Sequence, residues 1–332
     1  MKKFLQTSSA LVVAAGFASG ATAAEWETTV GGYMFAGVAL TDNDNDADGV
    51  GVLRDGEVHF DSRLTADNGV TFGVHVELEA WSQGSDQIDD NILFVEGGFG
   101  RVEIGGNDDA AYVMISSLAA FGAQGVHIGY QDQFGITGAA SGAGASSGLI
   151  GGDTTDAVGI HYYSPRLFGV QVGASYIPSK SADGVGDTNN FQFDDNVDEA
   201  WAVAANYYGD FGDFSVDGGV GYFNREGRSG PGGTGYDSLG FAGGVTYSGF
   251  GVRGYYDDDS RGDEWGAGVQ YQTGPWTIAG GYSESNVKDV DIATTWVTYD
   301  VAPGVSVSSA VEWAERGTAE DIGGAVILGL KF

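Results

Sequence analysis

The sequence contains no cysteine, so neither a disulfide framework nor a thiolate metal site is available to it. Basic residues are scarce, because 14 lysines and arginines stand against 46 aspartates and glutamates, for a formal charge of −32. Nucleic-acid phosphates require a basic surface, so we expect no nucleic-acid partner. A chain this acidic instead attracts cations and repels anions.

Long apolar runs are missing beyond the first two dozen residues. Residues 1–24 carry Lys2 and Lys3, a short apolar stretch, and small residues that allow cleavage after residue 23 or 24. This pattern is typical of a bacterial secretory signal peptide and is too short for a membrane helix. We therefore expect export and removal of residues 1–24, with residues 25–332 forming one mature domain.

The mature sequence alternates between apolar and polar residues. In residues 69–81, Phe72, Val74 and Val76 share one face, whereas His75 and Glu77 share the other. A period of two residues predicts β-strands. The pattern recurs in segments near 27–40, 53–66, 69–81, 91–97, 100–106, 157–164, 168–177, 199–208, 213–224, 237–247, 250–257, 264–272, 275–284, 291–300, 303–313 and 322–332.

The connections alternate between short turns, such as residues 66–69 and 97–100, and longer acidic loops, such as 41–52, 178–198, 225–236 and 257–264. An even number of strands joined in this way predicts an outer-membrane barrel. Closure is required in lipid, because every backbone group there must be hydrogen-bonded internally. An aromatic girdle at the membrane interface is expected where aromatic residues gather near the short turns: Phe99, Phe168, Phe211, Phe214, Phe250 and Trp276.

The chain ends on an alternating strand in which Leu328, Leu330 and Phe332 share one face. With this ending, the blocks "DSRLTADNGVTFGVHVELEAW" and "FGRVEIGGNDDA" make the sequence resemble the Gram-negative general porins over the whole mature chain. The resemblance implies an all-β, sixteen-stranded antiparallel transmembrane barrel that forms a homotrimer in the outer membrane. It also implies contact with lipid and lipopolysaccharide, passage of small hydrophilic solutes, no required cofactor, and recognition of the terminal strand by the barrel assembly machinery.

Residues 107–156 form the longest connection, and a loop of this length indicates a functional role. The resemblance implies that this third outer loop folds into the lumen and constricts it. We expect acids of the constriction among Asp108, Asp109 and Asp132, opposite a basic side formed by Arg54, His59, Arg63, His75 and Arg101. Because Glu77 and Glu103 lie among these basic residues, we expect the pore to prefer cations.

Residues 41–55 carry aspartates at nearly the spacing of an EF-hand calcium loop: Asp44, Asp46, Asp48 and Asp55. An EF-hand needs a helix on each side, whereas both flanks here alternate as strands. We therefore interpret the stretch as the first external loop. Two alternatives remain open, a weak calcium or magnesium site and a solvated acidic loop that binds no ion.

Functions other than that of a general porin are also compatible with a secreted β-protein. Outer-membrane lipases also use barrels, but we interpret the four histidines as polar residues of the lumen and loops, and expect no enzymatic activity. A channel selective for sugars or organic acids is one alternative, and saturable flux would identify it. A soluble secreted calcium-binding β-protein is the other, and recovery without detergent would identify it.

Overall fold

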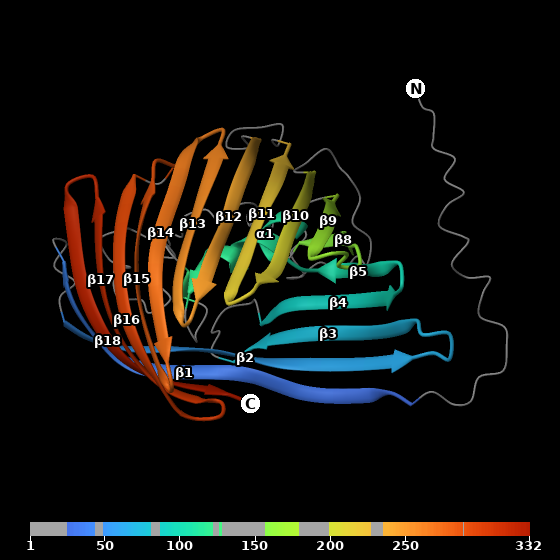
Figure 1. Ribbon diagram of the computed structural model, residues 1–332, viewed down its shortest axis with the longest axis horizontal. Helices are drawn as coiled ribbons and strands as arrows, with labels where there is room; N and C mark the ends of the chain where they lie inside the picture. The colour runs from blue at the N-terminus through green and yellow to red at the C-terminus, as the bar shows by residue number, and fades with distance from the viewer. Residues whose placement is uncertain are drawn as a thin grey trace.

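The computed structural model describes residues 25–43, 49–80, 87–121, 126–127, 157–178, 199–226, 235–287 and 289–332. Sixteen of its strands close into one antiparallel barrel, in which consecutive barrel strands are hydrogen-bonded neighbours (Figure 1). The predicted strands are therefore confirmed, and each observed boundary lies within four residues of the expected one.

The strands of the barrel are β1 (Glu27–Asn43), β2 (Gly49–Thr65), β3 (Thr71–Glu79), β4 (Ile88–Gly97), β5 (Gly100–Gly106), β8 (Val158–Tyr163), β9 (Val170–Ile177), β10 (Ala200–Phe211), β11 (Phe214–Arg225), β12 (Tyr236–Tyr247), β13 (Phe250–Asp259), β14 (Gly262–Thr273), β15 (Trp276–Ser285), β16 (Val290–Ala302), β17 (Val305–Arg316) and β18 (Ala319–Lys331). Twelve of the sixteen barrel strands have ten or more residues, which is long enough to cross an apolar layer about 25 Å thick at the usual tilt, whereas β3, β5, β8 and β9 are shorter.

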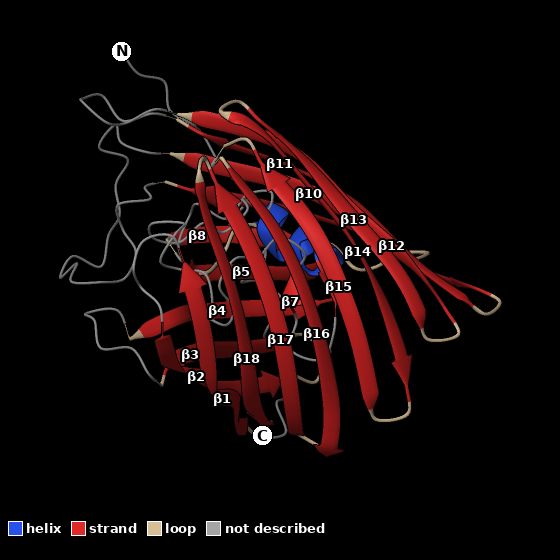
Figure 2. Cartoon of the chain, turned by 90° about the vertical axis from the view of Figure 1, so that its left-hand side faces the viewer, coloured by secondary structure: helices blue, strands red, loops and turns tan. Residues whose placement is uncertain are grey.

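The barrel closes where β18 pairs with β1, so the C-terminus lies beside the first strand (Figures 1 and 2). Gly32 and Phe332 exchange two backbone N–H···O bonds of 3.0 Å at this junction. The predicted terminal face is exposed, since Leu328, Leu330 and Phe332 all lie on the surface. The last strand therefore completes the hydrogen bonding of the first and presents apolar side chains outward.

Side chains alternate between two faces of the closed sheet. One face is apolar and exposed, with Phe60 and Leu78 among its residues. The opposite face, which we call the polar face, carries His59 and Glu77, which are directly paired across β2 and β3. A band of exposed apolar side chains around a closed barrel is stable in lipid, where no backbone edge is left unpaired.

One end of the barrel is formed by the turns at residues 66–70, 98–99, 164–169, 212–213, 248–249, 274–275 and 303–304. The aromatic residues predicted beside these turns are all exposed. Several stack on an aromatic residue of the neighbouring strand. Phe214 stacks on Tyr247 with ring centroids 4.5 Å apart, and Phe250 stacks on Tyr271 at 4.2 Å. This placement agrees with the predicted girdle, because amphipathic rings favour the interface between lipid and water.

One predicted acidic loop is wrong. Residues 257–264 were expected to form a long connection, but β13 continues to Asp259 and β14 begins at Gly262, so only two residues turn the chain. Asp257 and Glu264 lie on the polar face and accept hydrogen bonds from serines of the adjacent strands. Because these acids have partners across the sheet, their charge does not end the strands.

The long connection between β5 and β8 contains more regular structure than expected. It holds the helix α1 (Ala110–Ile115), the 3₁₀ helix η2 (Ser116–Ala119), and the short paired strands β6 (Ala120–Phe121) and β7 (Val126–His127). The helical segment, blue in Figure 2, packs against β8–β13. Among the described residues, no helix is long and apolar enough to cross a membrane.

Candidate functional site

Five titratable residues of β2, β3 and β4 converge on the polar face. We call Glu57, His59, His75, Glu77 and Asp90 the histidine–carboxylate wall. The strand register brings them together, because His59 lies opposite Glu77 and the alternation turns every second side chain to the same face. The hairpin that pairs β2 with β3 has its turn at residues 66–70, within the first of the two blocks that resemble porins.

The contacts within this wall are short. His59 Nε2 lies 2.8 Å from Glu57 Oε2 and 3.5 Å from Glu77 Oε1. His75 Nε2 lies 2.8 Å from the same oxygen of Glu77, and His75 Nδ1 lies 2.7 Å from Asp61 Oδ1. Two imidazoles therefore point their Nε2 atoms at one carboxylate oxygen.

The arginines of the expected basic side do not join this cluster. Arg54 lies on the face of β2 that carries Val52 and Val58, opposite to His59. Arg63 is mostly exposed and pairs with Glu27 at 2.9 Å. The structure therefore separates Arg54 and Arg63 from the histidines with which the sequence grouped them, because Arg54 lies on the other face of β2 and Arg63 lies near the end of that strand.

Arg101 lies on the polar face two strands away from the histidines, and acids surround it. Its Nε donates to Glu103, its Nη1 lies 3.5 Å from Glu96, and its guanidinium lies 3.8 Å above the Phe94 ring. Glu103 is buried and also accepts from Asn107 Nδ2 at 3.0 Å. The positive charge of Arg101 is thus compensated locally.

The expected constriction acids have different environments. Asp109 is fully buried and caps α1, since its Oδ1 accepts from the backbone nitrogens of Ala111 and Tyr112 at 2.8 and 3.1 Å. Asp108, its neighbour, is partly buried. Asp132 lies outside the described residues. Of these three acids, Asp109 has a defined structural task, which is to satisfy the first backbone donors of the helix.

A second group of side chains holds α1 and η2 against the sheet. We call Ser175, Asn206, Asp217 and Arg253 the loop-anchoring wall. Asn206 Nδ2 donates to the Met114 carbonyl at 3.0 Å, and Ser175 Oγ accepts from Ala110 N at 2.8 Å.

Arg253 is the strongest anchor in this wall. It donates to the Leu118 carbonyl at 2.9 Å and to both carboxylate oxygens of Asp217 at 2.6 Å. Such a two-pronged contact fixes the guanidinium plane, and therefore the direction of its bond to η2.

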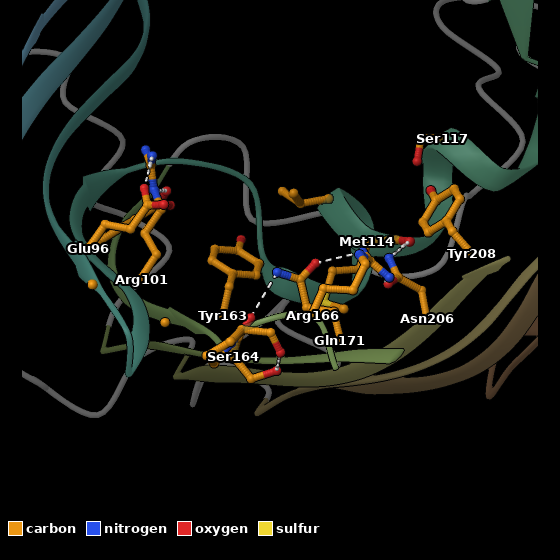
Figure 3. A pocket seen from close by; sticks show the side chains of 15 residues that line it. Glu96, Arg101, Met114, Ser117, Tyr163, Ser164, Arg166, Gln171, Asn206 and Tyr208 are labelled. Carbon is orange, nitrogen blue, oxygen red and sulfur yellow. Dashed lines mark hydrogen bonds and ion pairs between the residues drawn. The ribbon is translucent and has the colours of Figure 1, made fainter. Parts of the chain in front are cut away.

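A cavity of about 570 Å³ lies between α1 and the short turns that follow β4 and β8 (Figure 3). Arg101 and Arg166 line it, together with Tyr163 and Asn206. Arg166 Nη2 donates to Gln171 and to Asn206 at 2.8 Å each. The cavity thus borders the residues that hold α1, and its two arginines carry much of its polarity.

Residues 41–55, which resemble an EF-hand calcium loop, are described only in part. Asp44, Asp46 and Asp48 lie outside the described residues. Asp55 lies within β2, where its Oδ1 accepts from Gly56 N at 2.8 Å. The flanks of the stretch are the strands β1 and β2, as expected, so the helix–loop–helix of an EF-hand is excluded.

Sequence reasoning missed Asp90, Asn206, Asp217 and Arg253. Asp90 could have been found from the alternation of β4, because it shares parity with Phe94 and Glu96. The other three lie on strands far along the chain from the helix they hold. No local pattern in the sequence signals such contacts.

Comparison with known proteins identifies the family of this chain and solved structures that share its fold. A family model described as Gram-negative porin matches residues 7–318. No curated protein matches the chain. An anion-selective porin from Comamonas acidovorans is 15% identical, with a TM-score of 0.66 and coverage of 93% of this chain and 100% of that one.

Two further solved structures share the fold. A refined porin is 21% identical, with a TM-score of 0.67 and coverage of 92% of this chain and 100% of that one. The trimer form of the outer-membrane protein OmpT from Vibrio cholerae is 16% identical, with a TM-score of 0.60 and coverage of 92% and 99%. The family match over most of the chain and the closed barrel agree, so this chain belongs to the Gram-negative porin family and is an outer-membrane channel protein, not an enzyme.

Proposed function

We propose that the polar face encloses a water-filled lumen through which small hydrophilic solutes diffuse, with cations preferred over anions. The acidic character of the histidine–carboxylate wall carries this proposal. Glu57, Glu77 and Asp90 converge there with two imidazoles, and Glu79 and Asp89 lie within ligand distance of Glu57. Negative charge concentrated along a wall of low dielectric constant raises the local concentration of cations.

Two arginines of the polar face, Arg101 and Arg253, support the same preference, because carboxylates compensate them. Arg101 contacts Glu96 and Glu103, and Arg253 contacts Asp217. Arginine attracts anions most strongly where no carboxylate lies beside it. The anion-selective porin among the similar structures has the same fold, so selectivity must come from side chains rather than from the barrel.

We also propose that residues 107–156 narrow the lumen. The packing of α1 and η2 on the polar side of β8–β13 supports this, as do the hydrogen bonds from Asn206 and Arg253 to their backbone. Asp109 then contributes to the constriction by capping α1, and Asp108 and Asp132 are the candidates for its charged surface.

Assembly as a homotrimer is part of the proposal, supported by the family match and the trimeric OmpT structure. Export through residues 1–24, recognition of Leu328, Leu330 and Phe332 by the barrel assembly machinery, and contact with lipopolysaccharide belong to the same proposal. N-terminal sequencing of protein from outer membranes should begin at residue 24 or 25. Chain ends starting at Met1 would contradict export by cleavage.

Ion selectivity of purified protein in planar bilayers tests the central claim. In a KCl gradient with EDTA present, the reversal potential should have the sign of a cation-preferring pore, and the preference should weaken at 1 M salt, where the Debye length is about 3 Å. An anion-preferring potential would refute the proposal. Swelling of proteoliposomes in sugars of increasing size should give flux that is linear in concentration, whereas saturation would indicate a substrate-selective channel.

A further inference from the structure

The histidine–carboxylate wall has a geometry that ordinary pore-lining charge does not require. Glu77 Oε1 lies 3.5 Å from His59 Nε2 and 2.8 Å from His75 Nε2. Glu57 Oε2 lies 2.8 Å from His59 Nε2 on the other side. The ligand atoms of Glu57, His59 and Glu77 all lie within 4.8 Å of one another, and those of His75, Glu77 and Asp90 form a second such set that shares Glu77. Ligand atoms about 2.1 Å from a tetrahedral ion are roughly 3.4 Å from one another, so the first set can surround one ion after small adjustments, and His75 becomes the fourth ligand if its ring moves toward that set.

Residues behind the cluster orient its ligands. Asp61 Oδ1 lies 2.7 Å from His75 Nδ1, which leaves Nε2 of His75 as the nitrogen directed at Glu77. The Tyr33 hydroxyl donates to Glu57 Oε1 at 2.8 Å, which leaves Oε2 of Glu57 directed at His59. A carboxylate behind a histidine and a hydrogen bond behind a ligating carboxylate are the usual supports of protein metal ligands.

We propose that Glu57, His59, His75 and Glu77 bind one divalent transition-metal ion of the zinc class on the wall of the barrel. Imidazole ligands suit Zn²⁺, Ni²⁺ and Cu²⁺, whereas Mg²⁺ and Ca²⁺ favour sites made of oxygen atoms alone. Two carboxylates balance the charge of the ion. Without metal, imidazole N–H groups donate to the carboxylates, and the ion replaces those protons, which are released to water.

This site would act on the pore without being needed for it. A bound divalent ion adds positive charge to an acidic wall, so Zn²⁺ should reduce the cation preference of the open channel. The cation preference measured in EDTA does not depend on the site. Failure of the metal proposal therefore leaves the proposed function standing, and an anion-preferring channel in EDTA would leave the metal test intact.

Calorimetry of the EDTA-stripped trimer in detergent, titrated with ZnCl₂, tests binding directly. We expect saturable binding of one Zn²⁺ per chain, with protons released into the buffer. The double variant His59→Gln/His75→Gln should weaken binding by at least about 100-fold, and Asp61→Asn, which touches no metal, should weaken it by about 10- to 100-fold. Co²⁺ supplied in place of Zn²⁺ should show the visible absorption of a low-symmetry tetrahedral site.

The matched control is Glu96→Gln, which removes one carboxylate from the polar face outside the cluster. It should change Zn²⁺ affinity by less than about twofold. Channel conductance and heat-modifiable migration on gels establish that each variant has folded. Equal Zn²⁺ binding by the histidine variant, equal loss in Glu96→Gln, or competition by Mg²⁺ at similar concentrations would each overturn the proposal in favour of a diffuse cation atmosphere.

Discussion

The histidine–carboxylate wall and the loop-anchoring wall lie on the same face of one sheet and use similar side chains for different purposes. In the loop-anchoring wall, Arg253 and Asn206 donate to backbone carbonyls of α1 and η2, so their polarity supports another part of the chain. In the histidine–carboxylate wall, His59 and His75 contact carboxylates of their own and adjacent strands.

This contrast separates charge that organises the protein from charge that acts on solutes. Arg253 donates to the carboxylate of Asp217 and to the carbonyl of Leu118, so its positive charge is largely neutralised and attracts a passing anion only weakly. In the histidine–carboxylate wall, acids outnumber the fixed positive charges beside them, so a net negative potential remains to act on solutes. Counting charged residues on the polar face would therefore misjudge selectivity, because the partners of each charge decide what it does.

The largest effect should come from breaking the loop-anchoring wall at Arg253. Arg253→Ala leaves the carboxylate of Asp217 and the carbonyl of Leu118 without this donor in a poorly solvated place. Removal of one partner of a buried pair costs about 3–5 kcal/mol. We expect a lower unfolding midpoint in urea and a lower temperature of heat modification on gels.

The double variant Arg253→Ala/Asp217→Ala is the control for this prediction. It removes both charges, so no carboxylate is left uncompensated, and it should be clearly more stable than the single variant. If both variants were equally destabilised, the Asp217 pair would not be the reason for the loss. Anchoring of η2 by the guanidinium would then be the main contribution of Arg253.

A smaller effect is expected at Asp109, which the structure places at the helix cap rather than among solvated charges. Asp109→Ala removes the acceptor of two backbone N–H groups and should destabilise the protein by about 1–2 kcal/mol. Asp109→Asn keeps an oxygen at the cap and should retain most of the stability. Urea unfolding followed by tryptophan fluorescence measures both.

The same pair of variants distinguishes a cap from a pore charge. Asp109→Asn removes the charge but not the cap, so cation selectivity should stay unchanged while stability is kept. Asp108→Asn, next to it in the chain, provides the matched loss of charge without the cap. A fall in selectivity caused by Asp109→Asn alone would contradict the capping role.

The barrel could be predicted from the sequence because strand alternation is a local property. His75 and Glu77 are recognisable as polar-face residues from parity alone, and Phe332 marks the closing strand. The two strands β13 and β14 were predicted, but the tight turn between them was expected to be a long loop, because acidity is a poor guide to loops. Asp257 and Glu264 remain in strands through hydrogen bonds to Ser238 and Ser285, which lie on other strands.

The candidate site was predictable only in part, because some of its contacts join residues that are distant in the sequence. Register follows from hairpins, so the meeting of His59 and Glu77 is implied once the turn at residues 66–70 is recognised. The partner of Arg253 depends on where a connection that starts more than a hundred residues earlier is packed. That placement is decided by tertiary contacts. Arg54 was grouped with His59 although alternation turns their side chains to opposite faces of β2, so the face must be assigned for each residue.

Removing acids from either face of the barrel tests which face sets ion selectivity. Glu57→Gln/Glu77→Gln removes two charges from the histidine–carboxylate wall, and we expect the permeability ratio of K⁺ to Cl⁻ to fall by roughly twofold. The control is Glu284→Gln/Glu320→Gln, which removes two acids that accept from Trp265 and Trp313 on the opposite face. Reversal potentials in EDTA at low salt should change in the first variant and stay constant in the second.

The smallest effect should come from Arg63, which forms the same chemical pair as Arg253 in a different setting. Arg63 and Glu27 meet at 2.9 Å, but their side chains are 61% and 62% exposed, whereas those of Arg253 and Asp217 are 17% and 10% exposed. Water screens an exposed pair and both side chains lose rotamer freedom in forming it, so Arg63→Ala should cost less than about 0.5 kcal/mol. Urea midpoints of Arg63→Ala and Arg253→Ala, measured side by side, test whether burial or the ion pair itself sets the difference. Equal losses of unfolding free energy in the two variants would contradict the prediction, because the ion pair itself, and not its burial, would then set the cost.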